Sequence, residues 1–154
     1  MRLAKLITIF LIINFAGLYV GNLLMDNGPT GNWYLNLNKA PWTPPGWVFG
    51  AAWTTIMVCF SVYLGFLFKD FSSSFLKVFY AVQVLLNVSW NYVFFNQQWV
   101  YLGLIVIIAL FIVILYFFTT YQMDAMRKIR FLLLPYLIWL SIAISLNMYI
   151  AIHN

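Results

Sequence analysis

The sequence carries very little charge. It has 8 lysine and arginine residues and 3 acidic residues in 154 positions, so 7% of its residues are charged, against about a quarter in a typical soluble domain. With 65% hydrophobic residues, this composition predicts a membrane protein. The net charge of +5 does not indicate a nucleic-acid partner, because the basic residues are scattered at the ends of apolar runs and form no patch.

The residue types of conventional active sites and metal sites are also scarce. One histidine, one cysteine and 3 acidic residues provide no Ser-His-Asp set, no carboxylate pair and no cluster of metal ligands, so we predict no metal site. Cys59 is alone, which excludes an intrachain disulfide, and we expect it to pack within its apolar run. All charged residues lie at or outside the ends of the apolar runs, which weighs against an ion-coupled pump or a voltage sensor.

Five apolar runs are each long enough to cross a hydrocarbon core of about 30 Å. We therefore predict an all-α membrane protein with a single domain, residues 1–154, and a five-transmembrane-helix bundle with a long loop, residues 26–44, between helices 1 and 2. The first run is longer than the apolar core of a signal peptide and is followed by no cleavage site. We therefore expect it to be retained as a membrane span. Within it, Gly17 and Gly21 form a GxxxG pair, for which a dimer contact is one interpretation. The runs cover about residues 3–25, 45–68, 78–95, 99–121 and 131–152.

The basic residues fall almost entirely on one side of the predicted bundle. Five spans place the termini on opposite sides, and the side of the C-terminus carries only Lys39. By the positive-inside rule, the N-terminus is cytoplasmic, and the C-terminus and the 26–44 loop face outward. The basic residues on the N-terminal side are Arg2, Lys5, Lys69, Lys77, Arg127, Lys128 and Arg130.

Residues 33–53 combine prolines with a high density of aromatic side chains. Because prolines are tolerated at a helix start, we expect Pro44 or Pro45 in the first turn of the second span, with the Thr43 hydroxyl as its N-cap. The loop before it should run along the membrane surface. Tryptophan and tyrosine are enriched at membrane interfaces, so an interfacial belt is one interpretation. Their density favours another, an aromatic-walled cavity covered by a lid.

Two of the spans carry neutral polar residues in register with aromatic ones. On the third, Gln83, Asn87, Trp90 or Asn91, and Phe94 recur at helical spacing; on the fifth, Tyr136, Trp139 or Leu140, Ala143 and Asn147 do the same. Since an amide in hydrocarbon needs a partner, both asparagine faces should point into the bundle. Hydrogen bonds between helices would explain either asparagine alone. Together with the lid, the two faces favour a pocket for a large, flat, mostly apolar ligand.

These blocks resemble the TspO/MBR family, which comprises tryptophan-rich sensory proteins and the translocator protein, or peripheral benzodiazepine receptor. The matching segments are WY at 33–34, KAPWTPPGWVFGAAW at 39–53, LN at 86–87 with Trp90 and FF at 94–95, and PYLIW at 135–139 with Ala143, Leu146 and Asn147. The resemblance implies a bundle that is often a homodimer, with a pocket closed by the first loop. The implied ligand-binding residues are Tyr34, Trp42, Pro44, Trp53, Asn87, Trp90, Trp139, Ala143 and Asn147.

The resemblance also implies a ligand class and three possible functions. The leading one is a membrane receptor or carrier that binds tetrapyrroles such as protoporphyrin IX or haem, in a sensing, transport or scavenging role. No cofactor would be obligatory, and the propionates of the ligand would lie near Lys39. A second is light- and oxygen-dependent porphyrin degradation, with Trp53 and Trp139 as the catalytic residues. A third is a stress-linked scaffold or regulator with a protein partner.

Two departures from the family pattern refine these expectations. Asn91 follows the third-span tryptophan, where many members carry proline or serine. Tyr149 is followed by no lysine or arginine, so the weak cholesterol-recognition pattern is incomplete and tetrapyrroles are favoured over sterols. For this short chain we expect the bacterial cell membrane. His153, one residue from the end, is expected to be a solvated tail residue in preference to a ligand of haem iron.

Overall fold

The computed structural model describes residues 2–154, and within them it contains helices and loops but no strand. Five helices are long and apolar enough to cross a membrane, so the predicted all-α five-span membrane protein is confirmed. The long helices are α1 (Leu3–Leu24), α3 (Gly46–Asp70), α4 (Ser74–Asn91), α5 (Val100–Thr120) and α6 (Leu134–His153). The short ones are η1 (Gly28–Thr30), α2 (Asn32–Asn36), the π-helix η2 (Tyr92–Asn96) and η3 (Ile129–Leu133).

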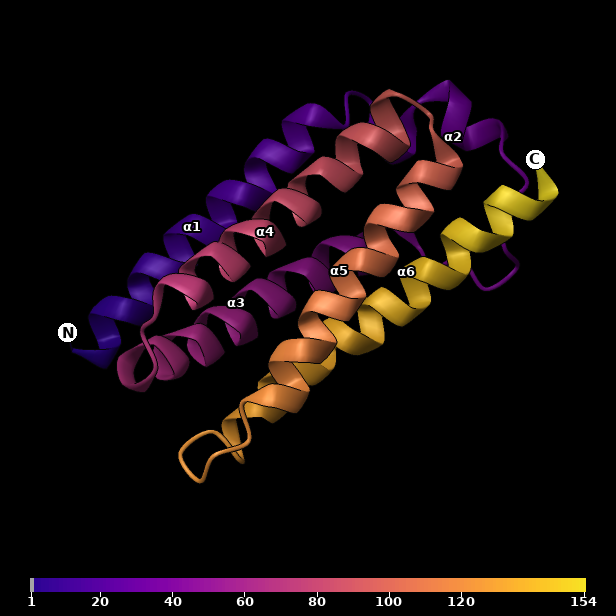
Figure 1. Ribbon diagram of the computed structural model, residues 1–154. Coiled ribbons are helices and arrows are strands. Elements are labelled where there is room, and N and C mark those ends of the chain that lie inside the picture. Colours follow the sequence, from indigo (N-terminus) through magenta and orange to yellow (C-terminus); the bar gives the residue numbers. More distant parts are fainter. Residues whose placement is uncertain (1) are drawn as a thin grey trace.

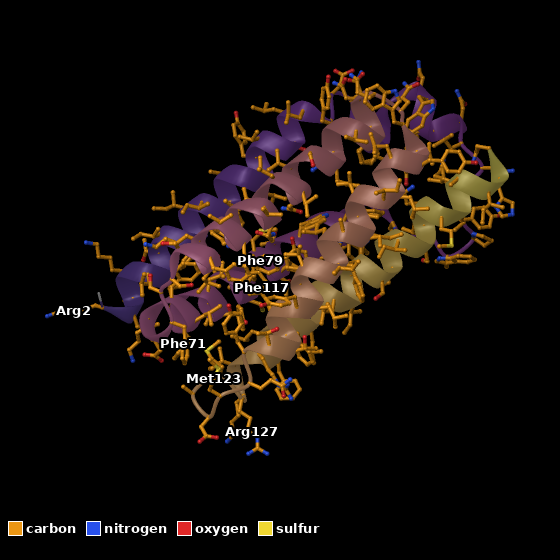
Figure 2. All side chains as sticks on the ribbon, viewed as in Figure 1. Arg2, Phe71, Phe79, Phe117, Met123 and Arg127 are labelled. Carbon is orange, nitrogen blue, oxygen red and sulfur yellow. The ribbon has the colours of Figure 1, made fainter. Side chains whose placement is uncertain are left out.

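The long helices pack in a ring in the order α1, α4, α5, α6, α3 and back to α1. Figure 1 shows the N-terminus and the α3–α4 and α5–α6 connections at one end of the bundle. The α1–α3 loop with α2, the α4–α5 connection and the C-terminus lie at the other end, which we call the lid end. Arg2 and Arg127 both lie away from the lid (Figure 2). The separation of the termini agrees with the topology inferred from charge; which end is cytoplasmic stays a prediction.

Two of the long helices begin at residues other than those at which their apolar runs begin. The third was expected from about residue 78, but α4 begins at Ser74, because the Ser73 hydroxyl accepts a hydrogen bond (3.1 Å) from the backbone N–H of Leu76. The fifth was expected from about residue 131, but η3 precedes it and α6 begins at Leu134, with Pro135 in its first turn. Apolar runs locate the hydrocarbon-facing residues, whereas caps and turns fix where the helix begins.

The predicted start of the second span is wrong in two details, the Thr43 cap and the place of the prolines. The Thr43 hydroxyl does not cap α3; it donates a hydrogen bond of 2.6 Å to the carbonyl of Ala40 and closes a turn there. Helix α3 begins at Gly46, Pro45 occupies the N-cap position without a side-chain hydrogen bond, and both Pro44 and Pro45 precede the first turn. A threonine two residues before the N-cap is too far away to reach the free N–H groups of that turn.

Glycines set how closely α1 approaches its neighbours. Gly65 on α3 faces Ile7, and a Cβ added there would overlap the Ile7 side chain and lie 3.3 Å from the Ile7 backbone nitrogen. Gly17 and Gly21 face α4: a Cβ on Gly21 would lie 2.7 Å from Nδ2 of Asn91. The GxxxG pair therefore mediates helix packing within the chain, and it does not support the dimer contact considered from sequence.

The half of the bundle away from the lid is filled with side chains. A buried polar group joins three helices there: Asn14 Nδ2 donates to Ser61 Oγ at 2.8 Å, and the Tyr80 hydroxyl donates to Asn14 Oδ1 at 2.7 Å. The rings of Phe79 and Phe117 meet between α4 and α5, with centroids 5.0 Å apart (Figure 2). This packing leaves the lid end as the part of the bundle that holds open space.

Candidate functional site

A cavity of about 540 Å³ lies inside the lid end of the bundle. Its wall takes side chains from α1, the α1–α3 loop, α3, α4, η2 and α6. Ligand pockets commonly measure about 300–1,000 Å³ and combine apolar and aromatic walls with a few polar groups. This cavity matches that description both in size and in the residues that line it.

On α3, the residues that line the cavity recur about once per helical turn, and two of them are glycines. Gly46, Gly50 and Trp53 line the cavity one turn apart, with Thr54 beside them. A Cβ added to Gly46 or Gly50 would meet no atom within 4 Å. Since glycine is costly within a helix, these two positions are best explained by the space they leave in front of Trp53.

The α6 wall repeats the same spacing with Trp139, Ala143 and Asn147, all of which line the cavity. The Asn147 amide makes a hydrogen bond at each of its two ends. Trp90 Nε1 donates to Asn147 Oδ1 at 3.3 Å, and Asn147 Nδ2 donates to the carbonyl of Val100 at 3.1 Å. The Asn147 amide therefore joins α4, α5 and α6, and its hydrogen bonds fix the indole of Trp90 in the wall.

The π-helix η2 turns further aromatic rings into the cavity. The N–H of Gln97 bonds the carbonyl of Tyr92 at 2.9 Å, the wide i→i+5 turn that often marks functional sites. Phe94 and Phe95, within this turn, both line the cavity, and the Phe94 ring stacks on Trp90 at 5.1 Å between centroids and 8° between planes. The wider turn keeps both consecutive phenylalanines in the wall.

The α1–α3 loop covers the cavity through Tyr34 on α2. Its ring contacts Phe95 at 5.4 Å between centroids, and burial raises the pKa of its phenol, so the hydroxyl stays protonated at neutral pH and is able to donate a hydrogen bond. Lys39 supports this short helix: its Nζ donates to the carbonyls of Tyr34 and Leu35 at 2.9 and 3.0 Å and to that of Leu37 at 3.4 Å. Its donors serve the end of α2, and the structure does not place Lys39 in the cavity wall.

A set of contacts that we call the lid latch fastens the loop to α6. The backbone N–H of Asn38 donates to Asn154 Oδ1 at 2.8 Å, and Asn154 Nδ2 donates to the Asn38 carbonyl at 3.2 Å. Trp42 Nε1 donates to Ser145 Oγ at 3.1 Å, and its ring lies edge-on to Tyr149 with centroids 5.5 Å apart. The latch holds the loop from outside the cavity.

Replacing Trp42 with phenylalanine should loosen the lid latch. The change removes the hydrogen bond to Ser145, with a net contribution of about 0.5–1.5 kcal/mol, so amide hydrogen exchange in residues 38–43 should accelerate roughly 2- to 10-fold. Trp47→Phe is the control, because Trp47 is exposed and its indole donates no hydrogen bond within residues 2–154. Equal protection in both variants would contradict the latch.

The structure brings most of the predicted site residues together. Seven of the nine line the cavity: Tyr34, Trp53, Asn87, Trp90, Trp139, Ala143 and Asn147. Trp42 and Pro44 do not. Trp42 is 55% exposed and lies in the lid latch on α6, and Pro44 lies in the approach to α3. The prediction that Trp42 and Pro44 lie in the wall of the pocket is therefore corrected, because neither residue lines the cavity.

Sequence reasoning missed the contribution of α1. Phe15, Leu18, Tyr19 and Asn22 line the cavity with the i, i+3, i+4, i+7 spacing of one helix face, and this signal was present in the sequence. Other lining residues that sequence reasoning did not assign to the pocket are Met25, Pro29, Gly46, Phe49, Gly50, Thr54, Phe95, Leu146 and Ile150, whereas Asn91 and Phe94 belong to the face predicted on the third span. Within residues 2–154, no charged side chain lines the cavity and no group of three metal-ligating residues is found.

Comparisons with known proteins agree with this architecture. The sequence profile of the TspO/MBR family matches residues 8–153. The chain is 34% identical to the tryptophan-rich sensory protein of Cereibacter sphaeroides, over 75% of this chain and 72% of that protein. It is 32% identical to the tryptophan-rich protein TspO of Archaeoglobus fulgidus, over 100% and 97%, and 28% identical to the human translocator protein, over 85% and 79%.

Proposed function

The chain belongs to the TspO/MBR family, and on that premise we propose that it binds tetrapyrroles such as protoporphyrin IX or haem within the bundle, as a receptor or carrier. Two of the relatives above are named for sensing and for translocation. Such roles need a ligand to be held and released unchanged, without a conventional catalytic group. A sensing, transport or scavenging role would use the same bound state.

One observation carries the proposal: a cavity of about 540 Å³ with aromatic walls on several sides. Trp53 on α3 and Trp139 on α6 supply indole faces, and Tyr34 closes the cavity from the lid. Aromatic rings bind flat conjugated ligands through offset or edge-on contacts, and each such contact adds about 0.5–1.5 kcal/mol to the area that is buried. A macrocycle is a ligand that uses several of these surfaces at once.

The structure refines the polar contacts expected for this ligand. Asn147 is already bonded to Trp90 and Val100, so Asn87 is the better placed of the two asparagines to bind a ligand. Propionates near Lys39 are not supported, because its ammonium is bonded to the carbonyls of the lid. We propose that the macrocycle lies between the α3 and α6 walls, with one polar edge toward α4.

A dark titration of protoporphyrin IX into the purified protein tests the proposal. We expect saturable quenching of tryptophan fluorescence, weakened roughly 3- to 10-fold by Trp53→Phe or Trp139→Phe through lost indole contacts. Trp99→Phe is the matched control, because Trp99 lines a separate groove at the surface of the lid end. Quenching that never saturates, or that depends on Trp99 alone, would argue against the cavity as the site.

Porphyrin degradation is the second candidate, because Trp53 and Trp139 both line the cavity. In that function, light would excite the porphyrin bound in the cavity. Dissolved O₂ would be the oxidant, and its oxygen atoms would be added to the macrocycle. Illumination after the dark titration separates the two functions. Loss of the Soret band to a product not formed by free porphyrin in detergent, and dependent on both tryptophans, would favour degradation; an unchanged bound ligand would favour a receptor or carrier.

The partners and the membrane stay predictions. We propose a homodimer in the bacterial cell membrane, with its N-terminus in the cytoplasm, on the basis of the family resemblance and the distribution of basic residues. Gly17 and Gly21 face α4, so the dimer would use another face. The scaffold alternative predicts that the tryptophans of the cavity are replaceable without any effect in the cell.

A further inference from the structure

Three asparagine side chains meet the cavity on its α1–α4 side. Asn87 and Asn91 lie one turn apart on α4, and Asn22 lies on α1. The helices approach closely here because residue 21 is glycine: a Cβ on Gly21 would lie only 2.7 Å from Asn91 Nδ2. We call Asn22, Asn87 and Asn91 the amide corner.

The amides of this corner make fewer hydrogen bonds than those of the buried residues Asn14 and Asn147. Asn87 is buried, Asn91 is half-buried and Asn22 is exposed. Asn14 and Asn147 each use both ends of their amides, in bonds of 2.7–3.3 Å to side chains or carbonyls. Within residues 2–154, the side-chain amides of Asn22 and Asn87 make no hydrogen bond, although Asn87 is only 9% exposed. Asn91 makes one long bond, 3.5 Å, from Nδ2 to the Asn87 carbonyl.

Unbonded amides in the wall of an apolar cavity are available to a ligand. A ligand that covers such an amide and excludes water from it, without replacing the hydrogen bond to water, incurs a cost of about 1–3 kcal/mol. The rest of the wall near the corner is apolar and aromatic, including Phe15, Leu18 and Phe94. A ligand group that both accepts from and donates to amides, or simply accepts from them, would recover this cost.

The charge of that group follows from what surrounds it. Among the described residues, no cation lines the cavity, and Lys39, the nearest in sequence to the lid helix, is bonded to three backbone carbonyls. Burying an ionised carboxylate without a counter-charge is far more costly than burying a neutral carbonyl. The corner therefore suits a neutral hydrogen-bonding group.

We infer that the amide corner is a polar subsite that selects an uncharged carbonyl or hydroxyl on the edge of the ligand over a free carboxylate. The inference rests on the proposed function and narrows it: the favoured ligands are tetrapyrroles, or similarly flat molecules, whose polar edge is an ester, amide or ketone. Asn22 and Asn91 act here as specificity-determining residues, since both can donate an N–H to the same edge of the ligand.

Three porphyrins that differ only at their edges test this subsite. Etioporphyrin carries alkyl groups alone, protoporphyrin IX dimethyl ester carries neutral carbonyls, and protoporphyrin IX carries carboxylates. Each is titrated in the dark, with correction for partitioning into protein-free micelles. We expect the wild-type protein to prefer the ester over the diacid, and Asn22→Leu and Asn91→Leu each to weaken ester binding roughly 3- to 10-fold, as expected for a lost hydrogen bond.

The same variants should bind etioporphyrin as the wild-type protein does, which controls for damage to the fold. Asn36→Leu is the matched control, because Asn36 is exposed at the end of α2 and lies outside the cavity wall. Equal losses for ester and etioporphyrin, or tighter binding of the diacid than of the ester, would overturn the subsite. If none of the three porphyrins binds the wild-type protein, the proposed function itself falls, and the subsite with it.

Discussion

Replacing Ala143 with phenylalanine should weaken porphyrin binding roughly 100-fold while leaving the bundle folded. Ala143 is 8% exposed and lies on α6 midway between Trp139 and Asn147, where its small side chain forms part of the cavity wall. A phenyl group there would extend into the space that the macrocycle needs, between the α6 and α3 walls. Overpacking costs about 1–3 kcal/mol, and because the ligand is rigid we expect the upper end, roughly a 100-fold higher dissociation constant.

The control for this variant is Ala81→Phe. Ala81 is exposed on α4, where a phenyl group would face lipid, so porphyrin binding in the dark titration should be unchanged. Thermal unfolding in detergent should show that both variants remain folded. Full affinity in Ala143→Phe would mean that the ligand does not occupy the space between α3 and α6.

Replacing Gly65 with valine should cause the largest loss of stability. The added atoms would overlap the Ile7 side chain and press against its backbone nitrogen, 3.3 Å from the new Cβ, at a close contact between α1 and α3. Relief requires the two helices to move apart, because a backbone atom cannot rotate away as the end of a side chain can. A penalty of about 2–3 kcal/mol should lower the midpoint of thermal unfolding by roughly 5–10 °C.

Gly50→Val is the matched control, since the same change on the same helix would meet no atom within 4 Å at its Cβ. We expect its unfolding midpoint to stay within about 2 °C of the wild type or to rise slightly, because glycine is a poor helix former. A similar loss of stability in both variants would show that α3 tolerates valine poorly in general, and would contradict a specific contact between Gly65 and Ile7.

Much of the fold could be predicted because the membrane imposes simple rules. A hydrocarbon core requires long apolar helices and expels charge, so five spans, with the termini at opposite ends of the bundle, follow from the length and number of the apolar runs. Polar residues inside such helices are costly, and their spacing therefore predicted the buried faces that carry Asn87 and Asn147. Both residues are buried in the structure.

What sequence reasoning could not locate depends on contacts between distant segments. Trp42 has the same amphipathic indole whether it lines a cavity or fastens a loop, and a loop has no periodicity that would decide between them. Only the fold shows Trp42 against Ser145. Likewise, an asparagine within a span predicts some hydrogen bond, but not that the Asn147 amide is bonded at both ends whereas the Asn87 amide makes no hydrogen bond to residues 2–154.

We propose that a flat macrocycle binds between α3, α4 and α6 beneath the lid. The most direct test is to crystallise the protein with zinc protoporphyrin and to locate the zinc by its anomalous scattering. We expect one anomalous peak inside the cavity, between Trp53 and Trp139 and within reach of Asn87. A peak only in the outer groove beside Trp99, or only on the lipid-facing surface of the bundle, would contradict it.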